Sequence, residues 1–237
     1  MIQVEGIFVG GGAISAPIIG EDFNWSGGDG TYQVLDDGGG NWRIKFLSSG
    51  TFTPLKDMVI DAFLVGGGGA SAGNYCGYGG AGYTTTVRSV VLTANTAYSI
   101  VVGAAGTNGN PSSAGGETTA FTASAAGGKN TSNGTSSSKR PGGAGGSGGA
   151  GYVSPVATTT GGTDGGDGTS SATTGGKGQG TTTREFGEAD GTLYASGGGS
   201  NLTATVSNSG NGGRNGITSI EPADGIVVIR QHKEVAA

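Results

Sequence analysis

Glycine is the most abundant residue of this chain and limits what the chain can fold into. It occupies 55 of 237 positions, while hydrophobic residues account for only 33%. Apolar side chains are therefore scarce for one conventional core of this length. A collagen helix is excluded because glycine does not recur strictly at every third position and because the chain has only six prolines. The glycine must serve another packed arrangement, or part of the chain must be disordered.

Five segments have the patterning of β-strands. Segment 42–46 alternates large apolar residues with basic ones, which places Trp42, Ile44 and Phe46 on one face of a half-buried strand. No segment combines an apolar period of about 3.6 residues with helix caps, so we expect almost no helix. The predicted strands are 42–46, 58–65, 83–92, 98–102 and 225–230.

The predicted strands lie on both sides of a glycine-rich middle region. Segments 83–92 and 98–102 are joined by a polar link of hairpin length, which predicts that they pair antiparallel. Because segment 225–230 lies close to the C-terminus, a sheet built from both ends of the chain would hold residues 66–216 as an insertion. The expected architecture is all-β, with an attachment or oligomerisation segment at 1–40 and a jelly-roll-like β-sandwich with its glycine-rich insertion at 41–237.

Glycine tracts of this kind can form rods of the polyglycine II type. Such a rod is extended, with three residues per turn and a rise of about 3.1 Å per residue. Without side chains, several rods can lie side by side and satisfy their backbone N–H and C=O groups between them. Disorder is the alternative for residues 129–180, which have almost no apolar side chains. The tracts expected to form rods are 66–69, 142–151, 161–168, 175–180 and 197–199.

Charge and hydropathy exclude several classes of partner. The net charge is −5 and only 12 residues are Lys or Arg, so the chain has no basic stripe for a nucleic-acid backbone. No segment reaches the roughly 18 apolar residues that a membrane span needs. The N-terminus lacks a basic region followed by an apolar run, so we expect no signal peptide.

Motifs for nucleotide binding and for nucleophilic catalysis lack the neighbouring residues that those functions require. Residues 67–72 match the dinucleotide fingerprint G-x-G-x-x-A, but the glycine-rich residues 74–80 cannot form the helix that must follow it. His232 is the only histidine, and its place in a polar C-terminal tail predicts a solvated side chain. The single Cys76 has no base nearby in the sequence and is interpreted as a small packed residue.

Carboxylates do not form a convincing catalytic or metal-binding set. A group near residue 188 could serve acid–base chemistry or bind a cation, but its spacing is not that of a calcium loop. A solvated loop is the favoured interpretation, and we predict no catalytic residue, no cofactor and no metal site. The carboxylates considered are Glu185, Glu188, Asp190, Asp164 and Asp167.

Aromatic and basic residues in the polar loops are the candidates for contact with a partner. Tyrosine offers a large flat surface at a low entropic cost. The alternative is that the aromatic residues pack over the glycine rods as local core and that the basic pair is simply solvated. The predicted receptor-contact residues are Asn74, Tyr75, Tyr78, Lys139, Arg140, Tyr152 and Phe186.

The order of these segments resembles the glycine-rich domain of phage and prophage tail proteins, especially those of Firmicutes. The resemblance extends over residues 41–233, although residues 70–78 interrupt a glycine run that is usually longer in that family. A looser likeness to the glycine-rich extracellular region of some receptor kinases supports the architecture only. The matching segments are 41–53, 61–69, 82–88, 97–103, 178–188 and 225–230.

The resemblance implies a component of a tail fibre or tail tip. We therefore expect an adhesin whose rod-connecting loops bind a bacterial surface receptor, either a glycan or a protein. Further expected partners are other tail proteins and sister subunits of a homo-oligomer, most simply a trimer. The expected location is the virion tail, outside the cell after lysis. The alternative is a purely structural spacer or a self-assembling extracellular filament subunit.

Overall fold

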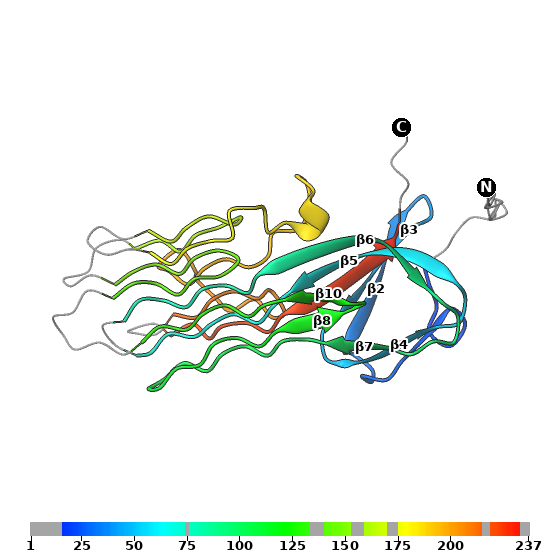
Figure 1. The fold of residues 1–237 in the computed structure, drawn as a ribbon, viewed down its shortest axis with the longest axis horizontal. Coiled ribbons are helices and arrows are strands. Elements are labelled where there is room, and N and C mark those ends of the chain that lie inside the picture. Colours follow the sequence, from blue (N-terminus) through cyan, green and yellow to red (C-terminus); the bar gives the residue numbers. More distant parts are fainter. Residues whose placement is uncertain are drawn as a thin grey trace, which may run out of the picture.

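Two five-stranded antiparallel sheets pack into a sandwich, from which a bundle of extended segments projects (Figure 1). The computed structural model describes residues 16–73, 76–132, 140–152, 159–169, 175–214 and 219–232. Sheet A has the order β1 (Phe23–Trp25), β4 (Gly50–Pro54), β7 (Tyr98–Val101), β8 (Thr118–Ala120) and β9 (Ala123–Ala125). Sheet B has the order β2 (Tyr32–Gly38), β3 (Asn41–Phe46), β10 (Ile226–Gln231), β5 (Met58–Val65) and β6 (Thr84–Leu92).

The main core lies between the two sheets and confirms the predicted strand alternation. Trp42, Ile44 and Phe46 of β3 are all buried in it. The ring of Phe52 in sheet A lies 5.5 Å from that of Phe46 in sheet B and 5.5 Å from that of Phe23. Burial of each such side chain stabilises the fold by roughly 1.5–3 kcal/mol, so a few large residues hold this small core together.

The predicted hairpin between segments 83–92 and 98–102 is wrong. Strand β6 pairs with β5 in sheet B, whereas β7 pairs with β4 and β8 in sheet A. The link between β6 and β7 crosses the end of the sandwich and is held there because Asn95 N–H donates to Pro54 O at 2.7 Å. The crossing buries Leu92 and Ile100 in one core from opposite sheets, which a hairpin within one sheet would not do.

The first forty residues are not a separate segment as far as the structure describes them. Strand β1 pairs with β4 and strand β2 pairs with β3, so both are integral to the sandwich. The predicted boundary after residue 40 falls inside the β2–β3 hairpin. Residues 1–15 lie outside the described residues.

Backbone hydrogen bonds with a three-residue period join the glycine-rich segments. In segment 66–70, three consecutive N–H groups donate to three different neighbours, and the next two return to the first two neighbours. This pattern is expected for polyglycine II, whose backbone has three residues per turn, and not for a β-strand, which has a period of two. The bonds run from Gly66 to Tyr83, Gly67 to Gly116, Gly68 to Ala223, Gly69 to Gly80 and Ala70 to Ser113, at 2.8–3.1 Å.

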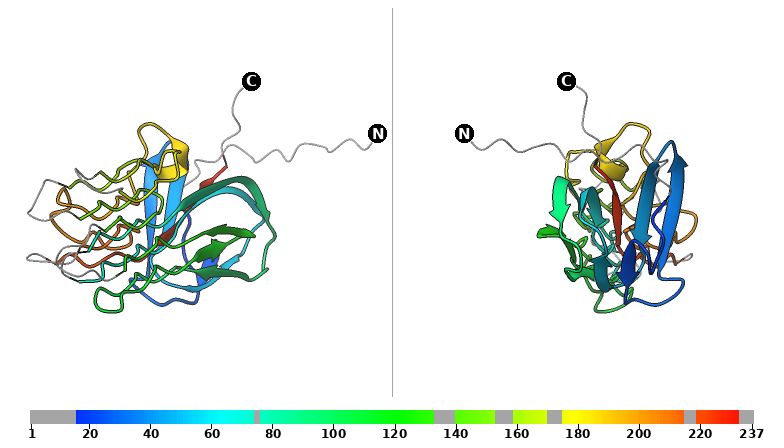
Figure 2. Two further views of the ribbon diagram at one scale, coloured as in Figure 1. Left: turned by 60° about the vertical axis from the view of Figure 1, so that its left-hand side comes forward. Right: turned by 90° about the vertical axis from the view of Figure 1, so that its right-hand side faces the viewer.

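Segment 78–83 repeats this pattern with three other neighbours. Its N–H groups donate in turn to the segments 147–150, 210–213 and 126–129, and donors three residues apart share a neighbour. The rod predicted at 66–69 is therefore confirmed, whereas segment 78–83 is a rod that the sequence analysis did not predict. With their neighbours they form a bundle rather than a sheet. Figure 2 shows the rods running side by side away from the sandwich in a second view.

Disorder is the wrong interpretation for the described parts of residues 129–180. Gly145 N–H donates to Lys177 O at 2.9 Å and Gly162 N–H donates to Gly148 O at 2.8 Å, which ties these parts into the bundle. The interrupting residues Ala70 and Ala72 are also buried within the bundle, at 0% and 1% exposed. Small side chains are thus accommodated at some positions of the rods.

Other rod positions admit no side chain at all. A Cβ atom added at Gly68 would overlap the carbonyl oxygen of Asn211, and one at Gly145 would overlap that of Ala81. These neighbours are backbone atoms of hydrogen-bonded rods, so they cannot rotate away as a side chain would. Among the described residues, the only helical element is the short turn η1 (Glu185–Gly187), and no helix there is long and apolar enough to cross a membrane.

We expect Gly145→Ala to destabilise the protein far more than Gly166→Ala. The first methyl group overlaps a backbone carbonyl inside the bundle, whereas the second meets only Thr163 O, at 3.1 Å. Overpacking of this kind costs about 3 kcal/mol where the neighbours cannot relax. Thermal unfolding of both variants measures the difference, and equal small shifts in melting temperature would contradict the packed bundle.

Candidate functional site

The residues predicted to contact a receptor fall into three groups. Asn74, Tyr75 and Lys139 lie outside the described residues. Three others lie together near one end of the bundle, and the last lies on the sandwich. We call the three that lie together the rod-end cluster, which consists of Tyr78, Arg140 and Tyr152.

The rod-end cluster lies at the end of the bundle remote from the sandwich. Segment 78–83 leads directly into strand β6, so Tyr78 lies at its end remote from the sheet, and Gly77 and Cys76 continue the chain beyond it. Its N–H donates to Ala150 O at 2.8 Å, while Tyr152 N–H donates to Arg140 O at 3.0 Å just beyond. All three residues are half-buried. Because each rod is hydrogen-bonded to three neighbours, the backbone positions that carry these side chains are fixed.

Phe186 does not offer an exposed contact surface, because it is buried with 2% of its surface exposed. It sits in η1, where the chain folds back over the outer face of sheet B. Its ring lies 6.0 Å from that of Phe63, and the Arg230 guanidinium carbon lies 4.1 Å from its centroid. The alternative interpretation as local core describes Phe186 correctly.

The segment around η1 covers a second apolar cluster on the outer face of sheet B. Phe63 and Val228 of the sheet pack there against residues of this covering segment. A charged network surrounds the apolar cluster, with arginines from the strands and carboxylates from both the strands and the covering segment. Members of the apolar cluster are Phe63, Val65, Ala81, Phe186, Tyr194, Ala195, Ile226 and Val228.

Glu185 is buried in this network and is not the solvated side chain that the sequence predicts. Only 2% of it is exposed, and it accepts a hydrogen bond from Arg43 Nη1 at 2.7 Å. Arg43 also binds Asp37, and this hydrogen bond, with a contribution from Glu185, raises the pKa of the guanidinium. Burial, together with the neighbouring Glu185 carboxylate, raises the pKa of Tyr194, so its hydroxyl stays neutral beside the acid.

Asp61 is the most buried carboxylate of the network, with 1% of its side chain exposed. Its Oδ2 accepts from Arg88 Nη1 at 3.1 Å and from Arg230 Nη2 at 3.2 Å. Its Oδ1 accepts from Ser89 N–H at 3.1 Å and lies 2.6 Å from His232 Nδ1. Burial, the largest influence, acts to raise the pKa of Asp61, but the hydrogen bonds together outweigh it and leave that pKa below its ordinary value.

His232 is therefore not solvated in a free tail, as its sequence position predicts. Its side chain is 21% exposed, and its backbone N–H donates to Val59 O at 2.9 Å. The sequence signal for this burial lies in two apolar strands. Asp61 and Arg230 each interrupt a strongly apolar strand, and a lone charge in such a strand needs a partner.

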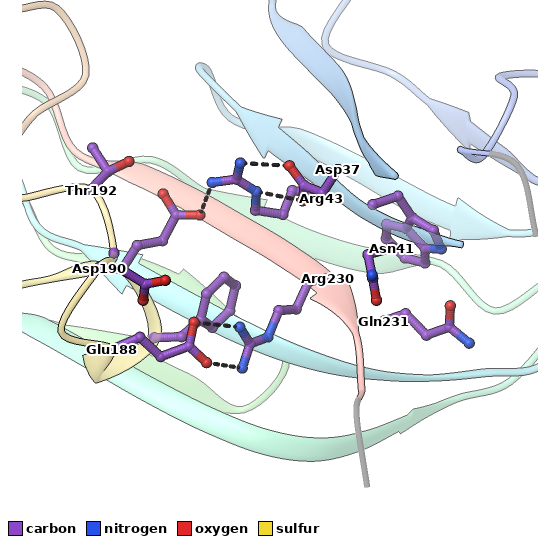
Figure 3. A pocket seen from close by; sticks show the side chains of 12 residues that line it. Asp37, Asn41, Arg43, Glu188, Asp190, Thr192, Arg230 and Gln231 are labelled. Atoms are coloured by element: carbon purple, nitrogen blue, oxygen red, sulfur yellow. Dashed lines mark hydrogen bonds and ion pairs between the residues drawn. The ribbon is translucent and has the colours of Figure 1, made fainter. Parts of the chain in front are cut away.

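A polar pocket of about 290 Å³ opens beside this network (Figure 3). Figure 3 shows Arg43 directed at Asp37 and Arg230 directed at Glu188, across the pocket from one another. The charges that line the pocket are thus largely paired, while Asp190 at its rim is exposed. Such a pocket suits hydrogen bonding to a neutral polar group better than binding of a free ion.

The remaining chemical candidates behave as ordinary structural residues. Asp167 pairs with Lys177 and Asp164 with Arg184 on the bundle surface. Cys76 is buried, with 1% of its surface exposed. Within the described ranges, no group of three or more His, Cys, Asp or Glu residues is placed to hold a metal ion.

These features define a class of protein in which a β-sandwich carries a bundle of polyglycine II rods. The sequence profile of the family described as a glycine-rich domain matches residues 47–230. The chain belongs to this glycine-rich domain family. A search of curated proteins finds no match to the chain.

We expect Asp61→Asn to lower stability at neutral pH by about 3 kcal/mol, because it removes the buried carboxylate that pairs with the largely buried Arg230. The pKa of Asp61 is below its ordinary value of 3.8, so its charge stabilises the fold above that pH. This contribution is lost as the pH falls through the folded-state pKa. The difference in melting temperature between wild type and variant should therefore shrink in acid. The exposed Asp29→Asn is the control, and a pH-independent difference for Asp61→Asn would contradict the linkage.

Proposed function

We propose that this protein is a phage or prophage tail-fibre or tail-tip adhesin that binds a bacterial surface receptor through the ends of its glycine rods. The observation that carries the proposal is the rod-end cluster, held at the end of the bundle remote from the sandwich. A receptor of this kind is a surface glycan or an outer protein. Its contact surface would extend from Tyr78 and Tyr152 over the neighbouring loops.

The rods are suited to presenting a binding surface in a fixed position. Each N–H group of segment 78–83 is bonded to one of three neighbouring segments, so the rod cannot bend in any single direction without breaking bonds. A preorganised surface loses little conformational entropy on binding. Tyrosine adds contact area with few rotatable bonds, which favours the same result.

The sandwich is the end suited to attachment within a larger particle. Strands β1 and β10 place both ends of the described chain on it, and the rods extend away from it (Figure 1). The resemblance to phage and prophage tail proteins supports a place in the virion tail, with other tail proteins as neighbours. After lysis, such a protein acts outside the cell.

A structural spacer or filament subunit is the second candidate function. It is favoured by the sheet edges, because β1 and β2 each have a partner strand on one side only. Ile18 and Ile19 beside β1 are 49% and 41% exposed, which suits contact with a sister subunit. Electron microscopy separates the two functions, since an adhesin gives discrete particles and a filament subunit gives long periodic fibres.

We expect the purified protein to bind cells of at least one strain in a bacterial panel, and Tyr152→Ser to weaken that binding about tenfold or more. Truncating an aromatic contact at the centre of an interface commonly has this effect. Tyr83→Ser is the matched control, since Tyr83 belongs to the same bundle but lies at its sandwich end. No saturable binding to any strain, or equal losses in the two variants, would count against the proposal.

We expect a homo-oligomer, most simply a trimer, in which the exposed strand edges and neighbouring apolar residues contact sister subunits. Light scattering should then give a mass of about three times 22.8 kDa. A mass of 22.8 kDa at all concentrations would show that the isolated chain is a monomer and would contradict this expectation.

A further inference from the structure

A serine, a histidine and a carboxylate form a continuous hydrogen-bonded chain on sheet B. Ser89 belongs to the edge strand β6, Asp61 to its neighbour β5, and His232 directly follows β10. Ser89 Oγ lies 3.1 Å from His232 Nε2, and His232 Nδ1 lies 2.6 Å from Asp61 Oδ1. A nucleophile bonded to a base, which is in turn bonded to an orienting acid, is the arrangement that activates serine for acyl transfer.

The chemistry of the partners fixes the direction of these hydrogen bonds. An ionised carboxylate only accepts, so His232 must donate its Nδ1–H to Asp61. In the neutral imidazole, Nε2 then carries a lone pair and accepts from the Ser89 hydroxyl. This tautomer is the one in which histidine can remove a proton from serine.

Ser89 and His232 both contact the same oxygen atom of Asp61. Oδ1 accepts from the backbone N–H of Ser89 as well as facing His232, whereas the two arginines bind Oδ2. The backbone of the nucleophile and the ring of the base are thereby fixed relative to each other. Asp61 touches no substrate and acts as a positioning residue.

The backbone at Ser89 is in a conformation that non-glycine residues rarely adopt. Its φ is +56°, and the register of β5 and β6 shifts at this point between Ile60 and Ala62. A β-bulge of this kind re-aims a side chain, and here it leaves Ser89 exposed while its hydroxyl faces His232. Strained serines of this type cluster at functional sites.

An exposed apolar surface lies beside the three residues. His232 N–H donates to Val59 O, and Val59 pairs across the strands with Val91. These valines are 41% and 70% exposed. Ser89 itself is exposed, so the site is open to solvent. It suits a small acyl group on an accessible ester rather than an enclosed substrate.

We propose that Ser89, His232 and Asp61 form a nucleophilic site that hydrolyses esters of small acyl groups. Ser89 Oγ attacks the ester carbonyl carbon while its proton passes to His232 Nε2. The ester C–O bond then breaks, and the alcohol leaves with that proton. Water hydrolyses the resulting acyl-serine by the same route, which releases the carboxylic acid and restores Ser89. The site lies on the sandwich and does not depend on receptor binding by the rod ends.

Covalent labelling with an alkyl fluorophosphonate tests the nucleophile directly. Ser89 should displace fluoride and form one phosphonate adduct, found by intact mass and located by peptide mapping. Ser89→Ala should abolish the adduct, whereas Ser99→Ala should leave it unchanged, because Ser99 is an exposed strand serine on β7 without a histidine partner. His232→Gln should slow labelling about 100-fold or more, the range expected for loss of a general base.

A thiol variant gives a second readout. Ser89→Cys places a thiol beside His232, which should speed its alkylation by iodoacetamide about tenfold or more over Ser99→Cys. Hydrolysis of p-nitrophenyl acetate should fall to background in Ser89→Ala. The same variant should still bind cells at the wild-type level. Absence of a phosphonate adduct, labelling that persists in Ser89→Ala, or equal alkylation of the two cysteine variants would each overturn the proposal.

Discussion

Backbone hydrogen bonding in three directions is the constraint on which the rest of this structure depends. A rod can have three neighbours only if its backbone comes close to theirs, and at Gly68 and Gly145 this closeness leaves no space for a Cβ atom. The abundance of glycine that leaves apolar side chains too scarce for one core of this length is therefore what makes the bundle possible. In the bundle, hydrogen bonds between closely packed backbones take the place of contacts between apolar side chains.

The sandwich supplies what the rods lack, because several strands continue into rods without a break. Strand β5 ends at Val65 and the first rod begins at Gly66, while Gly225 leads directly into β10. At this junction Thr118 donates its hydroxyl to Val65 O at 2.6 Å and accepts from Gly103 N–H at 2.9 Å. The apolar core thus sets the register of strands, and the strands set the register of the rods.

The sequence is a good guide to local patterns and a poor one to pairing over long distances. The alternation at Trp42, Ile44 and Phe46 and the glycine tracts follow from neighbouring residues, and both are confirmed. The hairpin prediction is wrong because a short polar link suits a turn within one sheet as well as a crossing between two. The sequence suggests that Glu185 and His232 are solvated because their partners are distant in the chain. Arg43 lies 142 residues from Glu185, and Asp61 lies 171 residues from His232.

The difference in packing between the rods and the sandwich also determines where reactive side chains can lie. Rod interiors accommodate only small side chains, so charged groups lie on the bundle surface, at the rod ends or on the sheets. The network around Asp61 joins strands β5, β6 and β10, which are held in place by the main core. The positions of its side chains are therefore fixed by the same core. Because the rod-end cluster lies at the end of the bundle remote from the sandwich, whereas Asp61 and Ser89 lie on its strands, substitutions at the two places should act additively.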